Sequence, residues 1–406
     1  MKSKKIWKIA CFVMVVCMEI TGMTGCGSKD IPAAQEEKIN VTEKGNDESN
    51  MQYGNSGGLI TAGDGKIYYI IESDKDYQKG DLMVMNEDGT QEEKICSFSN
   101  NERCLNYMDG YLYYVMADGD YDSVVKMKAD GSEKTVLFKE KPEEQKLLEY
   151  NSYSITQLVV LKNKIITKLN VSDGVYRFWY VYDCESQTNM RINSNLDIEW
   201  INSPEFNKNV QDIIFEDDWL FYCNSSEIRK ARYDGSEDSI ALDGQNLSLY
   251  GKIGDNIIYS TVEEKKSDNN ITVWNRQLKM FDIVQQKEYL FYEETVEHLN
   301  DIELVSVNIW KDQMYYVVLD PDSNKLQAVH QIDVLRQKGK ILYEFDEKCE
   351  IFETPYWKAF YEYGTICQFV NGWLYVDGYS NANFEDRAIY KIKLDGSVVE
   401  KVEPVV

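Results

Sequence analysis

Hydrophobic and polar positions follow one short pattern that recurs seven times along this chain. Each copy has a polar turn, then an aliphatic residue or Met, and then, in most copies, one or two aromatic residues. The clearest copies are residues 64–69 and 109–114. Self-similarity with a period of roughly fifty residues indicates a repeat architecture such as a solenoid or a propeller. The aliphatic positions of the copies are Ile67, Leu112, Ile165, Leu220, Ile257, Met314 and Leu374.

A second pattern follows the first in most repeats. Apolar residues alternate with Lys or Arg, and the run ends in Asp-Gly followed by Ser or Thr. Alternation of this kind predicts a strand with one buried face. Asp-Gly between two such runs is a strong hairpin signal, because Gly accepts the positive φ that the turn needs. The clear cases are residues 84–90, 124–132, 228–236 and 389–397.

Each repeat therefore reads as four strands: an apolar strand, the aromatic strand, the alternating strand and an outer strand after the turn. Four antiparallel strands repeated around an axis make a β-propeller, so we predict an all-β propeller of seven four-stranded blades. Six or eight blades remain alternatives, because the copies at Ile165 and Ile257 are weak. Residues 142–150 could form a short helix between blades two and three. The predicted domain spans residues 53–406, with blades at 57–100, 101–150, 151–208, 209–246, 247–297, 298–352 and 353–406.

The first residues read as a secretion signal. A Lys-rich start is followed by an apolar stretch at residues 9–18, which is too short to span a bilayer, and then by Met23, Thr24, Gly25 and Cys26. This segment resembles the lipobox of bacterial lipoproteins, although Met23 and Thr24 depart from the usual residues. The resemblance implies that residues 1–25 are removed and that Cys26 becomes a diacylated N-terminus. An ordinary cleaved signal or an uncleaved anchor is the alternative.

Residues 26–52 are expected to be a tether. Between residues 28 and 52 the chain has three Lys, six acidic residues and only scattered apolar ones. Such a composition cannot bury a core, so we predict a disordered stalk between the membrane and the propeller. Two acyl chains on Cys26 would anchor it stably to the outer face of the cell membrane.

The chain is strongly acidic, with a formal net charge of −25. This charge argues against nucleic acid and against adhesion to anionic lipids or acidic wall polymers. Solubility on a crowded surface is the simplest reason for it, and binding of a cation or a basic partner is the alternative. Only two His residues occur, His298 and His330, so a Ser-His-Asp triad or a multi-His metal site is hard to build. His330 lies in an alternating run and is expected to be structural.

The cysteines do not form a recognisable metal-binding or redox motif. No CxxC pair occurs, so zinc and redox motifs have no support. Cys96 and Cys104 are close in sequence and could form a disulfide outside the cell. The favoured alternative is that the cysteines are buried small hydrophobic residues, as the position of Cys223 in an aromatic strand suggests. The six propeller cysteines are Cys96, Cys104, Cys184, Cys223, Cys349 and Cys367.

Two acidic loops are candidate calcium sites, and no other cofactor is predicted. Both place oxygen ligands at alternate positions of one loop, an arrangement that suits a hard cation. Neither loop continues as an EF-hand, and a solvated hairpin loop is the simpler interpretation. The candidate ligands are Asp118, Asp120 and Asp122 in the first loop, and Asp320, Asp322 and Asn324 in the second. A pair of carboxylates for glycoside hydrolysis is permitted by the composition, but no pair can be singled out.

Binding is expected on the loops between the second and third strands of the blades, since these loops lie on one face of a propeller. The polar loops at residues 73–81, 263–270 and 378–386 belong to this set. Trp219 and Trp373 follow the polar turns directly and are expected to pack between blades. Aromatic residues that could instead be exposed for sugars or peptides are Trp179, Trp274, Tyr356 and Trp357.

The repeat resembles the YWTD-type propellers of low-density-lipoprotein-receptor relatives, in which Tyr-Trp-Thr-Asp follows a similar polar turn. Here only the aromatic positions match, as at Tyr68 and Tyr69, and the Thr-Asp pair is missing. The chain from Gly57 onward is more similar to a bacterial family called domain of unknown function 5050. Its members combine a lipoprotein signal or another surface module with repeats of the same aromatic and Asp-Gly patterns. This resemblance implies a fold but no activity. The lipobox-like segment and the Lys-rich start favour a Gram-positive cell surface.

These observations predict a lipid-anchored, extracytoplasmic propeller that binds a surface protein, a peptide or a glycan without catalysing a reaction. Two alternatives stay open. One is a hydrolase or lyase that acts on polysaccharide or peptidoglycan, and the other is a scaffold in a membrane complex. Fold alone does not decide among them.

Overall fold

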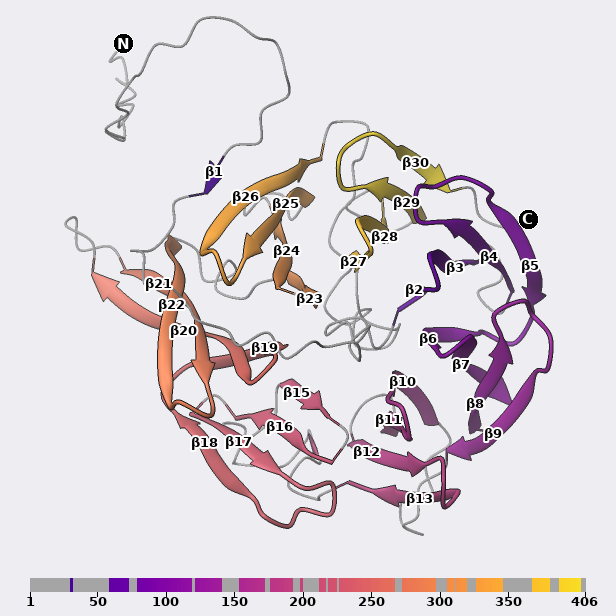
Figure 1. Cartoon of the computed structure of the whole chain (residues 1–406), viewed down its shortest axis with the longest axis horizontal. Helices are drawn as coiled ribbons and strands as arrows, with labels where there is room; N and C mark the ends of the chain where they lie inside the picture. Colours follow the sequence, from indigo (N-terminus) through magenta and orange to yellow (C-terminus); the bar gives the residue numbers. More distant parts are fainter. Residues whose placement is uncertain are drawn as a thin grey trace, which may run out of the picture.

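The computed structural model is a ring of seven antiparallel sheets, each with four consecutive strands (Figure 1). The prediction of an all-β, seven-bladed propeller is confirmed. The structure describes residues 30–31, 58–72, 79–118, 121–140, 153–171, 176–192, 198–199, 212–216, 218–224, 226–266, 272–296, 305–310, 312–319, 326–345, 367–379 and 387–402. The helix expected at residues 142–150 lies outside these residues.

The strands of the first four blades follow the predicted order. Blade 1 contains β2 (Ile60–Gly63), β3 (Lys66–Glu72), β4 (Gly80–Asn86) and β5 (Glu93–Phe98). Blade 2 contains β6 (Arg103–Met108), β7 (Tyr111–Asp118), β8 (Tyr121–Lys128) and β9 (Thr135–Glu140). Blade 3 contains β10 (Tyr153–Val160), β11 (Lys164–Val171), β12 (Tyr176–Asp183) and β13 (Thr188–Arg191), with β14 (Ile198–Glu199) also paired to β12. Blade 4 contains β15 (Asp212–Phe215), β16 (Leu220–Cys223), β17 (Glu227–Ala231) and β18 (Ser239–Asp243).

The remaining blades keep the same plan. Blade 5 contains β19 (Leu247–Ile253), β20 (Asn256–Lys266), β21 (Thr272–Asp282) and β22 (Lys287–Val296). Blade 6 contains β23 (Val305–Trp310), β24 (Gln313–Leu319), β25 (Leu326–Asp333) and β26 (Lys338–Glu344). Blade 7 contains β27 (Cys367–Val370), β28 (Trp373–Tyr379), β29 (Arg387–Lys393) and β30 (Val399–Val402). Both weak copies of the pattern, at Ile165 and Ile257, lie in second strands of complete blades.

The Asp-Gly turns join the third and fourth strands, as the pattern predicted. In blade 2 the N–H of Gly131 donates to the carbonyl of Lys128, and Gly131 has a φ of +87°. The Asp130 carboxylate accepts hydrogen bonds from the backbone N–H and the hydroxyl of Ser132, at 2.9 and 2.6 Å. The loop therefore has three residues with Gly in the left-handed position, a common hairpin form. The same side-chain contacts recur at Asp88, Asp234 and Asp395.

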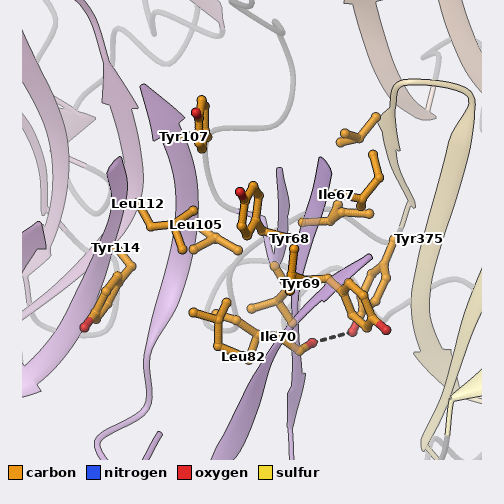
Figure 2. Close-up of a cluster of buried hydrophobic side chains, with 14 of the residues drawn as sticks. Ile67, Tyr68, Tyr69, Ile70, Leu82, Leu105, Tyr107, Leu112, Tyr114 and Tyr375 are labelled. Atoms are coloured by element: carbon orange, nitrogen blue, oxygen red, sulfur yellow. Dashed lines mark hydrogen bonds between the residues drawn. The ribbon is translucent and has the colours of Figure 1, made fainter. Parts of the chain in front are cut away.

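The core lies between the blades, where aromatic residues of one sheet pack on the next. Tyr68 of blade 1 stacks on Tyr107 of blade 2 with ring centroids 5.6 Å apart (Figure 2). The Tyr107 ring also covers Gly63, where an added Cβ would lie 1.9 Å from the ring. The Tyr107 hydroxyl donates to the Asp64 carboxylate. Residues of the repeated turn therefore join neighbouring blades as well as neighbouring strands.

Contacts between blades 7 and 1 close the ring. The indole N–H of Trp373 donates to the Glu87 carbonyl at 2.7 Å, and the Tyr375 hydroxyl donates to the Ile70 carbonyl at 2.6 Å. The backbone N–H of Leu59 donates to the Gln368 side chain at 2.8 Å. All four strands of blade 7 come from one continuous stretch of chain, so blade 1 contributes no strand to its sheet.

An N-terminal strand adds to blade 6. Strand β1 (Asp30–Ile31) pairs antiparallel with β26, with Asp30 opposite Lys340 and Ile31 opposite Gly339. Figure 1 shows it at the outer edge of this blade. The segment that was predicted to be a tether thus meets the propeller at one defined edge.

The described cysteines carry free thiols. Cys104 and Cys223 are buried, whereas Cys96 is half-buried and Cys184 is exposed. Burial raises the pKa of the Cys104 thiol to about 12. Cys104 and Cys223 therefore fit the favoured interpretation of buried small residues, whereas the exposed Cys184 does not, and Cys96 and Cys104 form no disulfide. Within the described ranges, no helix is long and apolar enough to cross a membrane.

Candidate binding face

One side of the ring carries the connections between second and third strands. In each antiparallel blade, the first strand begins on the side where the second strand ends. The N-terminal ends of β6 and β10 therefore share a face with the connection from β7 to β8. The long hairpin of β20 and β21 extends blade 5 on this side: β19 begins opposite Thr261, while β20 continues to Lys266. We call this side the binding face. The predicted polar loops lie partly on it, but their central residues are outside the described ranges.

The predicted calcium ligands are largely outside the described residues. This holds for Asp120, Asp320, Asp322 and Asn324, and for the side chain of Asp118, whose backbone ends β7. Asp122 is described, and its carboxylate is engaged by protein groups. Across the described ranges, no three His, Cys, Asp or Glu side chains are grouped to hold a metal ion. Calcium binding by the two loops remains a prediction, and so does lipidation of Cys26, which is also outside the described residues.

Asp122 belongs to a buried ion pair between blades 2 and 3. Its Oδ2 accepts from the Arg103 guanidinium and from the backbone N–H of Ile155, the latter at 2.6 Å. Arg103 also donates to the Ile155 carbonyl at 3.3 Å and to the Asn101 carbonyl at 3.0 Å. The side chains of Arg103 and Asp122 are 1% and 6% exposed. Burial raises the pKa of Asp122, while Arg103 acts in the opposite direction. The pair therefore fixes the start of β8 and β10 relative to each other.

Two tyrosines stand beside this ion pair on the binding face. Tyr121 begins β8 and Tyr153 begins β10, and their rings stack across the blade boundary with centroids 5.5 Å apart and planes inclined by 27°. Both side chains are partly exposed. They were not singled out from the sequence, because their proximity depends on the packing of two blades.

The aromatic candidates from the sequence have mixed outcomes. Trp179 is not exposed: it is buried and packs on Phe215 at 4.9 Å between ring centroids. Trp274 is partly exposed on the extended hairpin of blade 5. Tyr356 and Trp357 lie outside the described residues. Of the two residues expected to pack between blades, Trp373 does so, whereas Trp219 lies between the cations of Lys230 and Arg232 from its own blade.

The innermost strands of the seven blades are almost free of acidic residues. In Figure 1, β2, β6, β10, β15, β19, β23 and β27 surround the centre of the ring. Asp212 of β15 is the one Asp or Glu in these strands, although the chain has 69 acidic residues. Their two cations, Arg103 and Lys252, are buried and paired with Asp122 and Glu216. The other polar groups there are hydroxyls and side-chain amides.

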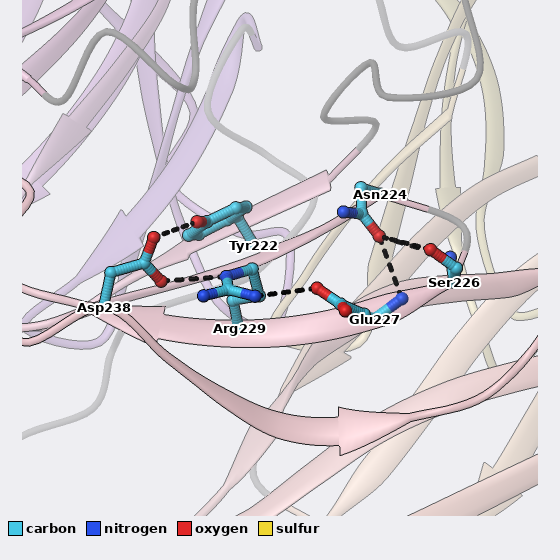
Figure 3. Close-up of polar contacts among 6 residues, drawn as sticks. All are labelled: Tyr222, Asn224, Ser226, Glu227, Arg229 and Asp238. Atoms are coloured by element: carbon cyan, nitrogen blue, oxygen red, sulfur yellow. Dashed lines mark hydrogen bonds and ion pairs between the residues drawn. The ribbon is translucent and has the colours of Figure 1, made fainter.

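Acidic side chains elsewhere in the described blades take part in local networks. In blade 4, Asp238 accepts from the Tyr222 hydroxyl at 2.8 Å and from Arg229 at 2.9 Å, and Arg229 also donates to Glu227 at 2.8 Å (Figure 3). Burial and the Asp238 carboxylate raise the pKa of Tyr222 to about 12. The Asn224 side chain accepts from the backbone N–H of Glu227 at 2.9 Å. This cluster shapes the short connection between β16 and β17.

A second network crosses from blade 5 to blade 6. Arg276 donates to Glu294, and the Tyr292 hydroxyl donates to the other Glu294 oxygen at 3.0 Å. The Tyr316 and Tyr292 hydroxyls share a hydrogen bond, and His330 Nδ1 lies 3.1 Å from the Tyr316 hydroxyl. Burial lowers the pKa of His330. The network gives the His330 side chain a hydrogen-bond partner within the sheet. This agrees with the structural role that was expected for His330.

Comparisons with known proteins give distant structural neighbours and no family. No known family matches the chain, and no curated protein is similar to it in sequence. One structural neighbour is oligogalacturonate lyase in complex with manganese, which is 10% identical to this chain in sequence. The match covers 90% of this chain and 97% of that chain, with a TM-score of 0.48. The β-propeller domain of the Trilobed protease from Pyrococcus furiosus has 10% identity, coverages of 85% and 97%, and a TM-score of 0.45. The nidogen/laminin complex has 9% identity, coverages of 84% and 94%, and a TM-score of 0.33. At these identities the likeness concerns the propeller fold alone.

Proposed function

We propose that this chain is a non-catalytic binding propeller, held at the outer surface of the cell membrane by a lipid on Cys26. The near absence of carboxylates from the innermost strands carries the proposal. A glycoside-cleaving site needs two carboxyl groups that face one reacting bond. The seven innermost strands offer only Asp212, and Asp122, Asp238 and Glu294 are engaged by Arg and Tyr side chains. Hydroxyl and amide groups suit recognition of a ligand instead.

The location rests on the leader sequence. A Lys-rich start, an apolar stretch and Cys26 in a lipobox-like segment support export and diacylation. Replacing Cys26 with Ser is expected to release the protein from the membrane fraction into the medium. Mass spectrometry of the mature N-terminus checks the modification directly. An unmodified Cys26 in membrane-bound protein would contradict the anchor without affecting the binding proposal.

The binding proposal is tested by photocrosslinking on cells. A photoreactive residue at Lys265 samples the binding face, and one at Glu133 samples the opposite side, since both side chains are exposed. We expect a crosslinked surface component from position 265 and little from position 133. Equal crosslinking from both positions would contradict a dedicated face. Turnover of a wall polysaccharide by the purified protein, lost on Asp212→Asn, would replace the proposal with the hydrolase or lyase alternative.

Binding is then measured on the purified protein. A component that binds only the native state raises the free energy of unfolding by about 2.7 kcal/mol at a hundredfold excess over its Kd. Unfolding measured with added calcium and with EDTA tests whether the two acidic loops bind calcium. A rise in the melting temperature with calcium that is lost in Asp120→Asn and Asp322→Asn would establish a metal-dependent face.

A further inference from the structure

The outer edge of blade 6 differs from the outer edges of the other blades. Within the described ranges, β26 is the one fourth strand that pairs with a further strand, β1. Gly339, which lies opposite Ile31, is buried. In each of the other blades the second residue of the fourth strand is exposed, at Lys94, Val136, Asn189, Ile240, Glu288 and Glu400. An added strand therefore covers this edge of the ring.

The sequence of β26 suits the close approach of a second backbone. Among the seven fourth strands that the structure describes, Gly339 is the only glycine. A glycine inside a strand weakens it and often marks a place where another backbone comes close. In this protein the residue without a side chain is the one that faces Ile31. The pairing thus coincides with the position in the outer strands that is best able to accept it.

The direction of β1 places the start of the chain toward the binding face. Fourth strands end on this face, because they run antiparallel to third strands that begin on it. Strand β1 is antiparallel to β26, so the chain enters β1 from the side of the binding face. Cys26 lies four positions before Asp30, and a chain of that length spans at most about 14 Å. Without the pairing, the chain from Cys26 to Gly58 could span about 110 Å.

We propose that the outer edge of blade 6 is the membrane-facing surface of the propeller, because β1 docks the acylated N-terminus against it. The inference rests on the proposed lipid at Cys26 and adds how the propeller is oriented. A lipid within about 14 Å of β1 keeps this edge near the bilayer, and the end of the edge at the binding face lies nearest. Strand β9 lies across the ring from β26 and is free to stand farther away (Figure 1).

Surface charge does not supply this orientation. The net charge of −25 gives the chain no attraction to an anionic membrane. A lipid on a long, unpaired tether would hold the protein at the membrane but would leave every blade equally free to approach it. The pairing of β1 with β26 removes that freedom, since the anchor then meets the ring at one blade.

The test measures how close two outer edges lie to the membrane. The mature lipidated protein is placed in liposomes whose surface carries a fluorescence acceptor. A fluorescent residue replaces either Lys338 of β26 or Thr135 of β9, which are both exposed and are both the first residue of a fourth strand. We expect much stronger energy transfer from position 338 than from position 135.

Breaking the pairing should remove this difference. The double variant Asp30→Pro with Ile31→Pro deletes both backbone N–H groups of β1. Transfer from position 338 should then fall to the level of position 135, because the anchor reaches the ring only through the long chain to Gly58. The double variant Val41→Pro with Thr42→Pro is the matched control, since it places two prolines in the same expected tether but outside β1. It should keep the difference.

The outcomes separate the orientation from the proposed function. Equal transfer from positions 338 and 135 in the otherwise natural protein would overturn the orientation, and this comparison decides even where a proline variant is less stable. A difference that survives the change at Asp30 and Ile31, or that is also lost in the control, would overturn the role of the pairing. An unmodified Cys26 in mass spectrometry refutes the lipid anchor, whereas lipidated protein with equal transfer refutes the orientation alone. Photocrosslinking from Lys265 tests partner binding independently of both.

Discussion

At the scale of single residues, several buried polar groups of this protein connect neighbouring blades, among them Arg103, Lys252 and Lys391. Arg103 and Asp122 are 19 positions apart, and Ile155 lies a further 33 positions along the chain. No sequence pattern links them, which is why Asp122 was considered a loop ligand for calcium. Trp179 was considered a candidate for exposure for a similar reason: its neighbour Phe215 belongs to the next blade. Burial at a blade boundary is decided by the adjacent sheet, which a local pattern does not encode.

The Arg103–Asp122 pair predicts a large and non-additive effect of mutation. Asp122→Leu or Arg103→Met alone should lower the free energy of unfolding by about 3–5 kcal/mol, because the remaining partner stays buried without compensation. The double variant Arg103→Met with Asp122→Leu should recover much of this loss. The exposed pair of Arg232 and Glu237 is the control, where single changes should cost about 1 kcal/mol or less. Urea unfolding measures the natural protein and each of these variants, and additive losses at Arg103 and Asp122 would contradict the coupling.

His330 predicts a loss of stability between neutral and mildly acidic pH. Its pKa is lowered in the folded state, so the unfolded state binds the proton more readily. The stabilising contribution of the neutral imidazole is present above the ordinary His pKa of about 6.5 and is lost as the pH falls below it. Denaturant unfolding at pH 7.5 and 5.5 should show a smaller loss for His330→Asn than for the natural protein. His298→Asn, which removes the other imidazole, should leave the difference unchanged if His330 is responsible.

At the scale of elements, the repeated turn and the aromatic strand were predictable because both are local. The aliphatic positions from Ile67 to Leu374 all fall in second strands, and the Asp-Gly turns join third and fourth strands. The pairing of β1 with β26 was not predictable, since Asp30 and Lys340 are separated by most of the chain. The same limit applies to the stacked pair of Tyr121 and Tyr153, because its two rings come from different blades.

The Asp-Gly turns predict a shared sensitivity to acid. Hydrogen bonds from the following Ser or Thr lower the pKa of Asp88, Asp130, Asp234 and Asp395. A lowered folded pKa gives stability that is present above the ordinary Asp value of about 3.9 and is lost as the pH falls through the folded value. Asn at all four positions keeps an acceptor for the turn but removes the titration. The variant should therefore lose less stability than the natural protein between pH 6 and pH 3, and an equal loss would assign the acid sensitivity to other groups.

At the scale of the whole molecule, the ring is closed by side chains and not by a shared strand. The seam between blades 7 and 1 depends on Trp373, Tyr375 and Gln368, which bond to backbone groups of blade 1 or of the residues just before it. Lys391 adds an ion pair to Glu92 at 2.9 Å across the same seam. A propeller whose last blade is self-contained can open at this point without breaking any sheet. The seam is therefore the place where the stability of the ring depends most on individual residues.

Trp373 and Trp219 test this view, because they occupy the same position of the repeat in different surroundings. Trp373 is 1% exposed, lies against Gly89 of blade 1 and donates to Glu87, whereas Trp219 is partly exposed between two cations of its own blade. Trp373→Ala should lower the free energy of unfolding by about 3–5 kcal/mol, as expected for a buried aromatic residue. Trp219→Ala should cost about 1 kcal/mol, the size of an exposed cation–π contact. Hydrogen exchange should also rise selectively in β2, β3 and β28 of the Trp373 variant, because opening begins at the seam. Similar losses for both variants, or exchange that rises evenly around the ring, would mean that all blade boundaries hold the propeller equally.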